Sequence, residues 1–270
     1  PDEMKKIEDL IAQVTDSQIQ SVTNGGTEFD FVQEFAAPVT LQISMDLIGI
    51  QMSDYQRMRE WIDEIIEIKR SEYSSSKSKI PDTSTQAVEY MKDIVEVKKE
   101  DPKHDLMSMM VQETELTDEE IGSNCLDILM ASHSTMADFL SNAIFLIIKN
   151  DLTHKTDNGE LSGMLEEVLR YRSPLQAHIR EMSGAIKIDG TTIPRGEYVI
   201  LWLGAANRDP ERYDQPETFL PDRNPEHLAF GAGAHTCIAA PLARFEAPII
   251  LRSFMEHFAD AEILYDSIEP

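Results

Sequence analysis

One long apolar segment, residues 116–151, constrains the fold of this chain more than any other feature. It reads LTDEEIGSNCLDILMASHSTMADFLSNAIFLIIKND, and Thr117 and Glu120 at its start have the spacing of a capping box. Apolar residues then continue on almost all sides as far as Ile148, which is typical of a buried helix. At about 1.5 Å per residue, roughly 30 residues cover about 45 Å. We therefore expect this helix to run through the centre of the molecule.

Apolar residues at helical spacing occupy most of the first two-thirds of the chain. Pro38 and Gly49 are placed to begin and end one helix, and Ser53 is placed to cap the next. The polar segment 74–85 predicts a loop. Besides 116–151, the pattern predicts helices over residues 1–22, 29–50, 53–73, 85–101 and 160–174, the last one stopped by Pro174.

The pattern changes at residues 185–204, which alternate between apolar and polar and are rich in β-branched side chains. Asp189-Gly190 predicts a hairpin turn, and 194–196 (Pro-Arg-Gly) a second turn. An amphipathic helix is expected at 240–258. The fold class predicted is therefore mainly α with a small β element, and since no linker is evident, we expect a single domain over 1–270.

Charge and cysteine content exclude several classes of function. The chain has 24 Lys and Arg against 49 Asp and Glu, a net charge of −25, which disfavours nucleic acid and anionic membranes as partners. Two cysteines, Cys125 and Cys237, cannot build a disulfide framework or a four-thiolate metal site, and they fit a reduced, cytoplasmic compartment. No run of 18 apolar residues predicts a membrane span.

Cys237 lies in the segment HLAFGAGAHTCIAAPLAR, residues 227–244, which leaves three interpretations open. It could be a buried structural cysteine, a catalytic thiol with His235 as its base, or a thiolate ligand to a metal centre. Gly231 and Gly233 permit positive φ, so the backbone can double back towards a flat object. A helix that starts after Cys237 would point its first N–H groups at the sulfur and lower its pKa. This geometry favours a single axial haem ligand.

The same segment resembles the haem-binding signature of the cytochrome P-450 superfamily, in its soluble bacterial and archaeal form. Ala239 is a departure, because the family usually has glycine there, and its methyl group must fit close to the haem or to the central helix. The positions in register with the family are Phe230, Gly231, Gly233, His235 and Cys237.

Two further groups of residues resemble family motifs. Glu167 and Arg170 in EEVLR resemble the family's Glu-x-x-Arg, and Arg223 resembles the third member of its buried ion-pair network, which braces the cysteine loop. Taken alone, such a pair is more often solvated on a helix surface. Arg180 aligns with an arginine that binds a haem propionate, and His235 with another propionate partner; the alternative for Arg180 is an exposed arginine at a strand end.

Within the long helix, MASHSTMADF resembles the family's oxygen-binding groove. The resemblance implies that the small Ala131 lets dioxygen approach and that Thr135 helps deliver protons. Ser134 stands where the family usually has an acidic or amide residue; it can relay a proton through water but carries no charge. The alternative for Thr135 is a hydroxyl bonded back within its own helix.

The resemblance implies a fold in which the long central helix lies over haem b and the cysteine loop lies beneath it, with Cys237 as the axial ligand. It implies a monooxygenase that inserts one atom of dioxygen into a small organic substrate, with electrons from a separate ferredoxin- or flavodoxin-type donor. A peroxide-driven or non-oxygenating haem-thiolate enzyme, a non-catalytic haem-binding module and an acidic helical protein without haem are the alternatives. The resemblance runs from Pro1 to about Ile263. The family's N-terminal β-rich part and its final hairpin have no counterpart here, so we expect a truncated chain or a sequence with segments omitted.

Overall fold

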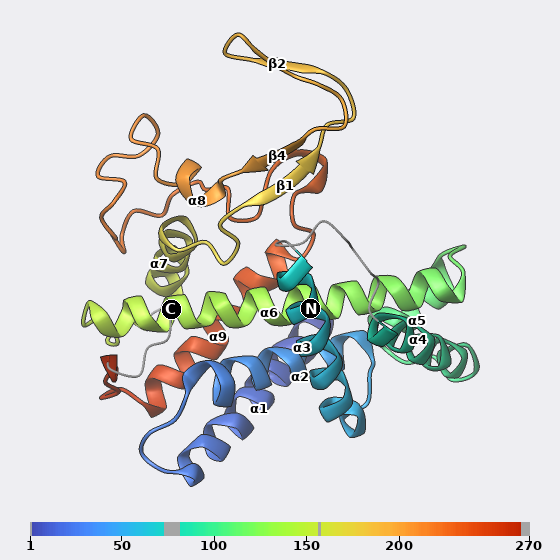
Figure 1. The fold of residues 1–270 in the computed structure, drawn as a ribbon. Helices are drawn as coiled ribbons and strands as arrows, with labels where there is room; N and C mark the ends of the chain where they lie inside the picture. The colour runs from blue at the N-terminus through green and yellow to red at the C-terminus, as the bar shows by residue number, and fades with distance from the viewer. Residues whose placement is uncertain (1, 73–81, 156–157, 266–270) are drawn as a thin grey trace. The chain divides into compact units, whose positions relative to one another are not determined.

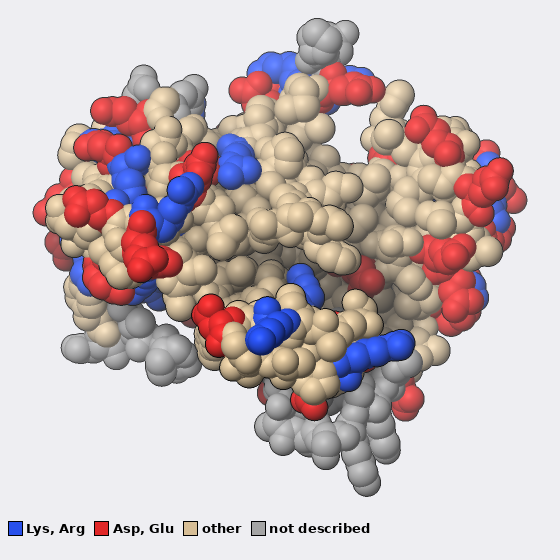
Figure 2. All heavy atoms as spheres, turned by 90° about the horizontal axis from the view of Figure 1, so that it is seen from above, with Lys and Arg blue, Asp and Glu red and all other residues tan. Residues whose placement is uncertain are grey.

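The computed structural model describes residues 2–72, 82–155 and 158–265 (Figure 1). Contacts divide the chain into two compact units, Pro1–Ala137 and Asp138–Pro270, and the division falls within helix α6 (Asp118–Lys149). We describe each unit by itself, and the single domain over 1–270 stays a prediction. On the face shown in Figure 2, Asp and Glu side chains form several separate groups rather than one patch.

The first unit is helical, as the sequence predicts. A π-helical segment, Phe31–Ala36, leads directly into the helix that Pro38 was expected to begin. Its α-helices, apart from the first part of α6, are α1 (Asp2–Gly25), α2 (Ala37–Ile48), α3 (Tyr55–Glu72), α4 (Asp82–Glu100) and α5 (Leu106–Glu113).

Three details of the first unit differ from expectation. Ser53 does not cap a helix: it lies inside a short 3-10 helix, Met52–Asp54, whose N-cap is Gln51. The expected loop at 74–85 is wrong in its last four residues, because α4 already begins at Asp82; residues 74–81 lie outside the described residues. Helix α5 was not predicted, since eight residues give a weak periodic signal.

The core of the first unit is formed by apolar side chains from α2 to α6. Cys125 is one of them, and its burial, with the nearby charge of Asp105 as a second cause, raises the pKa of its thiol to about 11. The core members, none more than 4% exposed, are Leu41, Met45, Ile48, Ile50, Met58, Ile62, Ile65, Ala87, Met91, Val95, Met107, Ile121, Cys125, Leu126 and Leu129.

Gly49 ends α2, as predicted, in the left-handed conformation with φ of 97°. A Cβ atom there would lie 2.3 Å from the carboxyl carbon of Asp105, which caps α5 and pairs with Lys98 Nζ at 2.5 Å. We expect Gly49→Ala to lower the free energy of unfolding by about 2–3 kcal/mol in urea denaturation, because strain and a collision combine. Gly25→Ala is the matched control: a Cβ at Gly25 meets nothing within 4 Å. Equal effects of the two substitutions would contradict the assignment.

Helix α6 begins with the predicted capping box. The Thr117 N–H donates to Glu120 Oε2 at 2.8 Å, and the Glu120 N–H donates to Thr117 Oγ1 at 3.3 Å. The helix has 32 residues, about 48 Å at ~1.5 Å each. Most sides of the helix are buried or partly buried, as expected, but residues at helical spacing leave one side exposed. That side includes two carboxylates, which favour water, and consists of Asn124, Asp127, Ile128, Ala131 and Asp138.

The second unit joins helices to a small β element, which confirms the predicted class. The predicted hairpin turn is present, with φ of 46° at Asp189 and 83° at Gly190. Strand β1 (His178–Glu181) pairs antiparallel with β4 (Tyr198–Leu201), and β2 (Ile186–Ile188) with β3 (Thr191–Ile193), so the element begins earlier than expected. Besides the second part of α6, its α-helices are α7 (Asn158–Tyr171), a short α8 (Leu203–Ala206) and α9 (Ala240–His257).

Helices α7 and α9 pack against each other within the second unit. The helix predicted to stop at Pro174 ends at Tyr171, in keeping with the restricted backbone before a proline. Helix α9 confirms the prediction for 240–258 to within one residue. Among the described helices of the chain, none combines the length and apolar character needed to cross a membrane.

Candidate functional site

The loop that carries Cys237 doubles back on itself, as the glycines predict. Gly231 and Gly233 have φ of 71° and 76°. The Cys237 N–H donates to the Phe230 carbonyl at 2.9 Å, which closes the loop just before α9 begins. Cys237 is a free, exposed thiol, so the interpretation as a buried structural cysteine does not hold for it.

The donor set around Cys237 fits a prosthetic group held by one sulfur. The described residues contain no group of three His, Cys, Asp or Glu side chains that could hold a metal ion. Within this same part of the chain, no hydrogen bond joins His235 to Cys237, and both residues are exposed. A Cβ added at Gly233 would meet nothing within 4 Å, so this side of the loop leaves room for a planar group. An open site with a single cysteine sulfur suits haem better than a closed tetrahedral metal centre.

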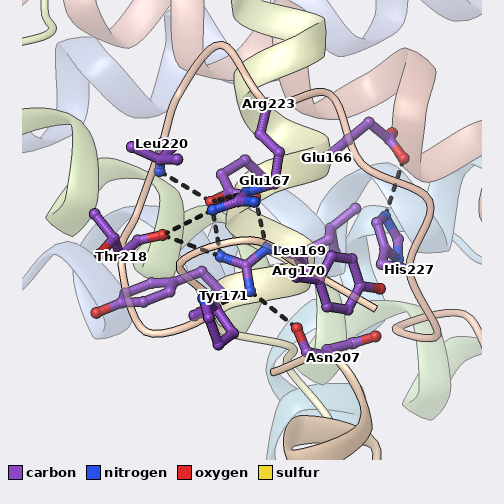
Figure 3. Close-up of polar contacts among 12 residues, drawn as sticks. Glu166, Glu167, Leu169, Arg170, Tyr171, Asn207, Thr218, Leu220, Arg223 and His227 are labelled. Atoms are coloured by element: carbon purple, nitrogen blue, oxygen red, sulfur yellow. Dashed lines mark hydrogen bonds and ion pairs between the residues drawn. The ribbon is translucent and has the colours of Figure 1, made fainter. Parts of the chain in front are cut away.

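Figure 3 shows the ion-pair network that the sequence analysis expected, built on the buried Glu167 and Arg170 of α7. Arg170 Nε and Nη2 donate to the two oxygens of Glu167 at 2.7 and 2.8 Å. Its remaining N–H groups donate to the carbonyls of Asn207 and Pro216, both at 2.9 Å, and of Thr218 at 3.2 Å. All five N–H donors of the guanidinium are therefore used.

The third expected member, Arg223, joins through its Nε, which donates to Glu167 Oε1 at 3.2 Å. The same oxygen accepts the Leu220 N–H at 2.9 Å. Arg223 also donates to the backbone carbonyls of Asp214 and Gln215, at 2.6 and 3.1 Å. The network thus fixes the backbone of the segment that leads towards the cysteine loop.

Asn207, which sequence analysis did not assign, connects this network to the cysteine loop. Its side chain is buried; Nδ2 donates to Ser173 Oγ at 2.9 Å, and Oδ1 accepts the Leu228 N–H at 2.7 Å. Its carbonyl accepts from Arg170. One residue therefore joins α7 to the beginning of the loop.

A second cluster was missed, and it begins at the neighbour of Glu167. Glu166 accepts from His227 Nε2 at 3.0 Å and from Arg244 Nε and Nη2 at 2.8 and 2.9 Å. Burial would raise the pKa of Glu166, but hydrogen bonds from His227 and Arg244 and the charge of Arg244 lower it to about 2. The two glutamates in EEVLR were the only signal in the sequence.

The other residues assigned in this unit lie as follows. Arg180 is exposed on β1, opposite Val199 of β4, and its Nη1 donates to the Ile179 carbonyl at 2.9 Å. It therefore has the exposed strand position that was the alternative to a propionate-binding role. His235 is exposed at the end of a 3-10 turn, Gly233–His235. Ala239 is the N-cap of α9 and is partly buried.

In the first unit, the hydroxyls expected to handle protons bond back to their own helix. Thr135 Oγ1 donates to the Ala131 carbonyl at 2.6 Å, and Ser134 Oγ donates to the Met130 carbonyl at 3.1 Å. This is the alternative stated for Thr135. Ala131 lies on the exposed side of α6, and Ser134 and Thr135 are partly buried.

His133, between these residues, is buried beside Thr40. Its Nδ1 lies 3.1 Å from Thr40 Oγ1, which also donates to the His133 carbonyl at 3.2 Å. Burial lowers the pKa of His133 from 6.5 to about 4, with Asp63 raising it and Arg59 lowering it by smaller amounts. Between about pH 4 and pH 6.5, the folded chain therefore holds a neutral imidazole, whereas the same side chain in the unfolded chain binds a proton.

This burial predicts a pH dependence of stability. Since the folded-state pKa is the lower one, the contribution of His133 is complete above pH 6.5 and is lost as pH falls towards about 4. We expect the loss to reach about 3 kcal/mol in urea denaturation measured from pH 7 to pH 4. His133→Gln should reduce this slope, whereas the control His154→Gln, at an exposed position, should keep it. An unchanged slope in His133→Gln would show that other groups cause the loss.

Comparison with known proteins agrees with this geometry. A family model described as Cytochrome P450 matches residues 161–262. The chain is 34% identical over 242 residues to the biotin biosynthesis cytochrome P450 of Bacillus subtilis, covering 86% of this chain and 61% of that protein. It is 30% identical over 276 residues to cytochrome P450 119 of Sulfolobus acidocaldarius, covering 98% of this chain and 70% of that protein.

Solved structures match over the same extent. CYP164A2 of Mycobacterium smegmatis with econazole bound has a TM-score of 0.87 at 28% identity, covering 97% of this chain and 68% of that chain. CYP109E1 from Bacillus megaterium in complex with testosterone has a TM-score of 0.84 at 32% identity, covering 96% of this chain and 72% of that chain.

The first three curated relatives are covered over 61%, 62% and 66% of their own length, so the chain spans about three-fifths to two-thirds of them. The cysteine loop, the mainly helical fold and these similarities agree with one another: this chain belongs to the cytochrome P450 family.

Proposed function

We propose that this chain is the haem-binding part of a haem-thiolate monooxygenase, with Cys237 as the axial ligand of haem b. The observation that carries the proposal is the exposed thiol of Cys237, which follows a glycine turn and lies two residues before the N-cap of α9 in a P450 chain. When bound through a thiolate, haem supplies the chemistry that cleaves the O–O bond of dioxygen.

The residues of the second unit would hold this group. The Phe230 carbonyl accepts the Cys237 N–H and so holds the backbone that would present the sulfur. Arg180 and His235, both exposed, would supply donors for the two propionates, and Ala239 at the helix start would lie on the side of the porphyrin. Both side chains are exposed and therefore accessible to a carboxylate.

Three residues of α6 would serve the substrate side. Ala131 presents only a methyl group on the exposed side of the helix, which supports the approach of a small molecule. The hydroxyls of Thr135 and Ser134 would turn from their helix carbonyls to pass protons through water. Ser134 can relay a proton but not hold a charge, so proton delivery here depends on water.

The substrate would be a small organic molecule, and the electrons would come from a separate ferredoxin- or flavodoxin-type donor. The names of relatives mention biotin biosynthesis, an erythromycin C-12 hydroxylase and a testosterone complex, and together they point to no single substrate class for this chain. A cytoplasmic location stays a prediction from cysteine content.

A peroxide-driven reaction is the second candidate, and the uncharged Ser134 favours it. The test is to add haem to the chain, record the reduced, carbon monoxide-bound spectrum, and then measure substrate turnover with a reduced donor protein or with hydrogen peroxide. A strongly red-shifted Soret band with donor-dependent turnover supports the monooxygenase, and peroxide-dependent turnover supports the second candidate. A histidine-like band would contradict both, and a red-shifted band without turnover would point to a non-catalytic haem-binding module.

A further inference from the structure

Two adjacent glutamates on α7 serve different partners. Glu167 accepts from Arg170 and Arg223 and so holds the segment around residues 207–223. Glu166 is half-buried and accepts instead from His227 and Arg244, as Figure 3 shows for His227. The family-like network accounts for Glu167, and nothing in the proposed function uses Glu166.

The partners of Glu166 lie on the two sides of Cys237. His227 precedes Cys237 by ten residues, at the start of the loop, and Arg244 follows it by seven, in the second turn of α9. One carboxylate therefore binds both flanks of the loop. Arg244 binds it through two nitrogens, a pairing that fixes direction as well as distance.

Contacts continue from both flanks into the loop, and those from Arg244 lead through Phe230 to the backbone of Cys237. His227 Nδ1 accepts the Ala229 N–H at 3.2 Å, so the network assigns the ring proton to Nε2, which faces Glu166. The guanidinium carbon of Arg244 lies 4.6 Å from the centre of the Phe230 ring. The Phe230 carbonyl in turn accepts the Cys237 N–H.

We infer that Glu166 is a positioning residue: by binding His227 and Arg244 together, it holds the loop in the geometry that presents the Cys237 sulfur. The inference rests on the proposed function, because positioning matters only if Cys237 is a ligand. A cavity of about 270 Å³ borders the cluster, with Glu166, Arg244 and Asn224 on its wall. Water can therefore reach Glu166 and Arg244. Neutralising Glu166 then leaves no charged group buried away from water, and the chain should still fold.

Hydrogen exchange in the full chain tests the brace directly. Glu166→Gln keeps the shape and removes the charge; Glu160→Gln makes the same change at an exposed position of the same helix. We expect exchange of the Cys237 and Ala229 amides to become about tenfold faster in Glu166→Gln, because charge-assisted hydrogen bonds are lost. Exchange at Leu251, buried in α9, should stay unchanged in both variants.

Arg244→Gln is the second variant, since the Arg244 side chain is 45% exposed and its loss is the milder change. If Glu166→Gln fails to fold, Arg244→Gln takes its place, and it should accelerate hydrogen exchange of the Cys237 amide in the same way. Wild-type exchange at Cys237, or acceleration that Leu251 shares, would overturn the inference, because the loop would then not depend on Glu166 or would open only with the whole unit.

With haem added, Glu166→Gln should raise the share of reduced, carbon monoxide-bound protein that shows a histidine-like band, and Glu160→Gln should not. A spectrum of Glu166→Gln identical to the wild type would overturn the positioning role. If the wild type itself lacks the red-shifted band, the proposed function fails, and with it the role towards haem, while the exchange result still decides whether Glu166 braces the loop.

Discussion

Replacing Cys237 by serine is expected to abolish the red-shifted Soret band of the reduced, carbon monoxide-bound protein. A serine hydroxyl does not ionise near neutral pH and is a poor donor to iron, so the electron density that a thiolate supplies would be absent. The loop itself should survive, because its closing bond joins backbone atoms of Cys237 and Phe230, and the side chain is exposed. The measurement is the difference spectrum of both proteins at equal haem content.

Cys125→Ser is the matched control for this substitution. Cys125 is buried in the core of the first unit, and the pKa of its thiol is raised to about 11, so it does not offer a thiolate at neutral pH. The red-shifted band should persist in this variant even if its stability falls. Loss of the band in Cys125→Ser with retention in Cys237→Ser would reverse the assignment of the ligand.

Replacing Arg170 by methionine is expected to lower the free energy of unfolding by about 3–5 kcal/mol, because one member of a buried ion pair is removed. Both side chains of the pair are fully buried, so Glu167 would keep a charge with only Arg223 and the Leu220 N–H to compensate it. The carbonyls of Asn207, Pro216 and Thr218 would also lose their donor. Urea denaturation of the chain measures the effect.

Arg212→Met provides the surface comparison for this loss. Arg212 forms an ion pair with Glu226, but the two side chains are 63% and 87% exposed, so we expect a change within about 1 kcal/mol. The double variant Arg170→Met with Glu167→Gln should recover part of the stability lost in Arg170→Met, because the stranded charge is gone. If Arg170→Met lowers the free energy of unfolding no more than Arg212→Met does, the network does not stabilise the fold.

The parts of the fold that could be predicted from sequence are those with local causes. The capping box of α6 needs only residues 117–120, and the turn at Asp189-Gly190 needs only two residues that tolerate positive φ. The same holds for the cysteine loop, where the glycines dictate the reversal. Helix α5 was not predicted, because its eight residues contain too few turns to show a helical hydrophobic periodicity.

The site was harder to predict because its contacts are distant in sequence. Glu166 and Glu167 are identical in type and adjacent, yet one binds residues 61 and 78 positions away and the other binds Arg223, 56 positions away. No local pattern distinguishes them; the resemblance alone pointed to Glu167. The hydroxyls of Ser134 and Thr135 are a similar case, since side-chain rotation decides whether each faces its helix or a ligand.

The saturation of Arg170 has a consequence for how this chain can change over evolutionary time. Three of its hydrogen bonds end on carbonyls between positions 207 and 218, each at a set place along that irregular segment. Surface segments without regular structure ordinarily tolerate changes in length. In this segment, however, insertion or deletion of a single amino acid would move at least one carbonyl beyond hydrogen-bonding distance of Arg170. The length of this segment should therefore be inherited as strictly as the identity of the arginine.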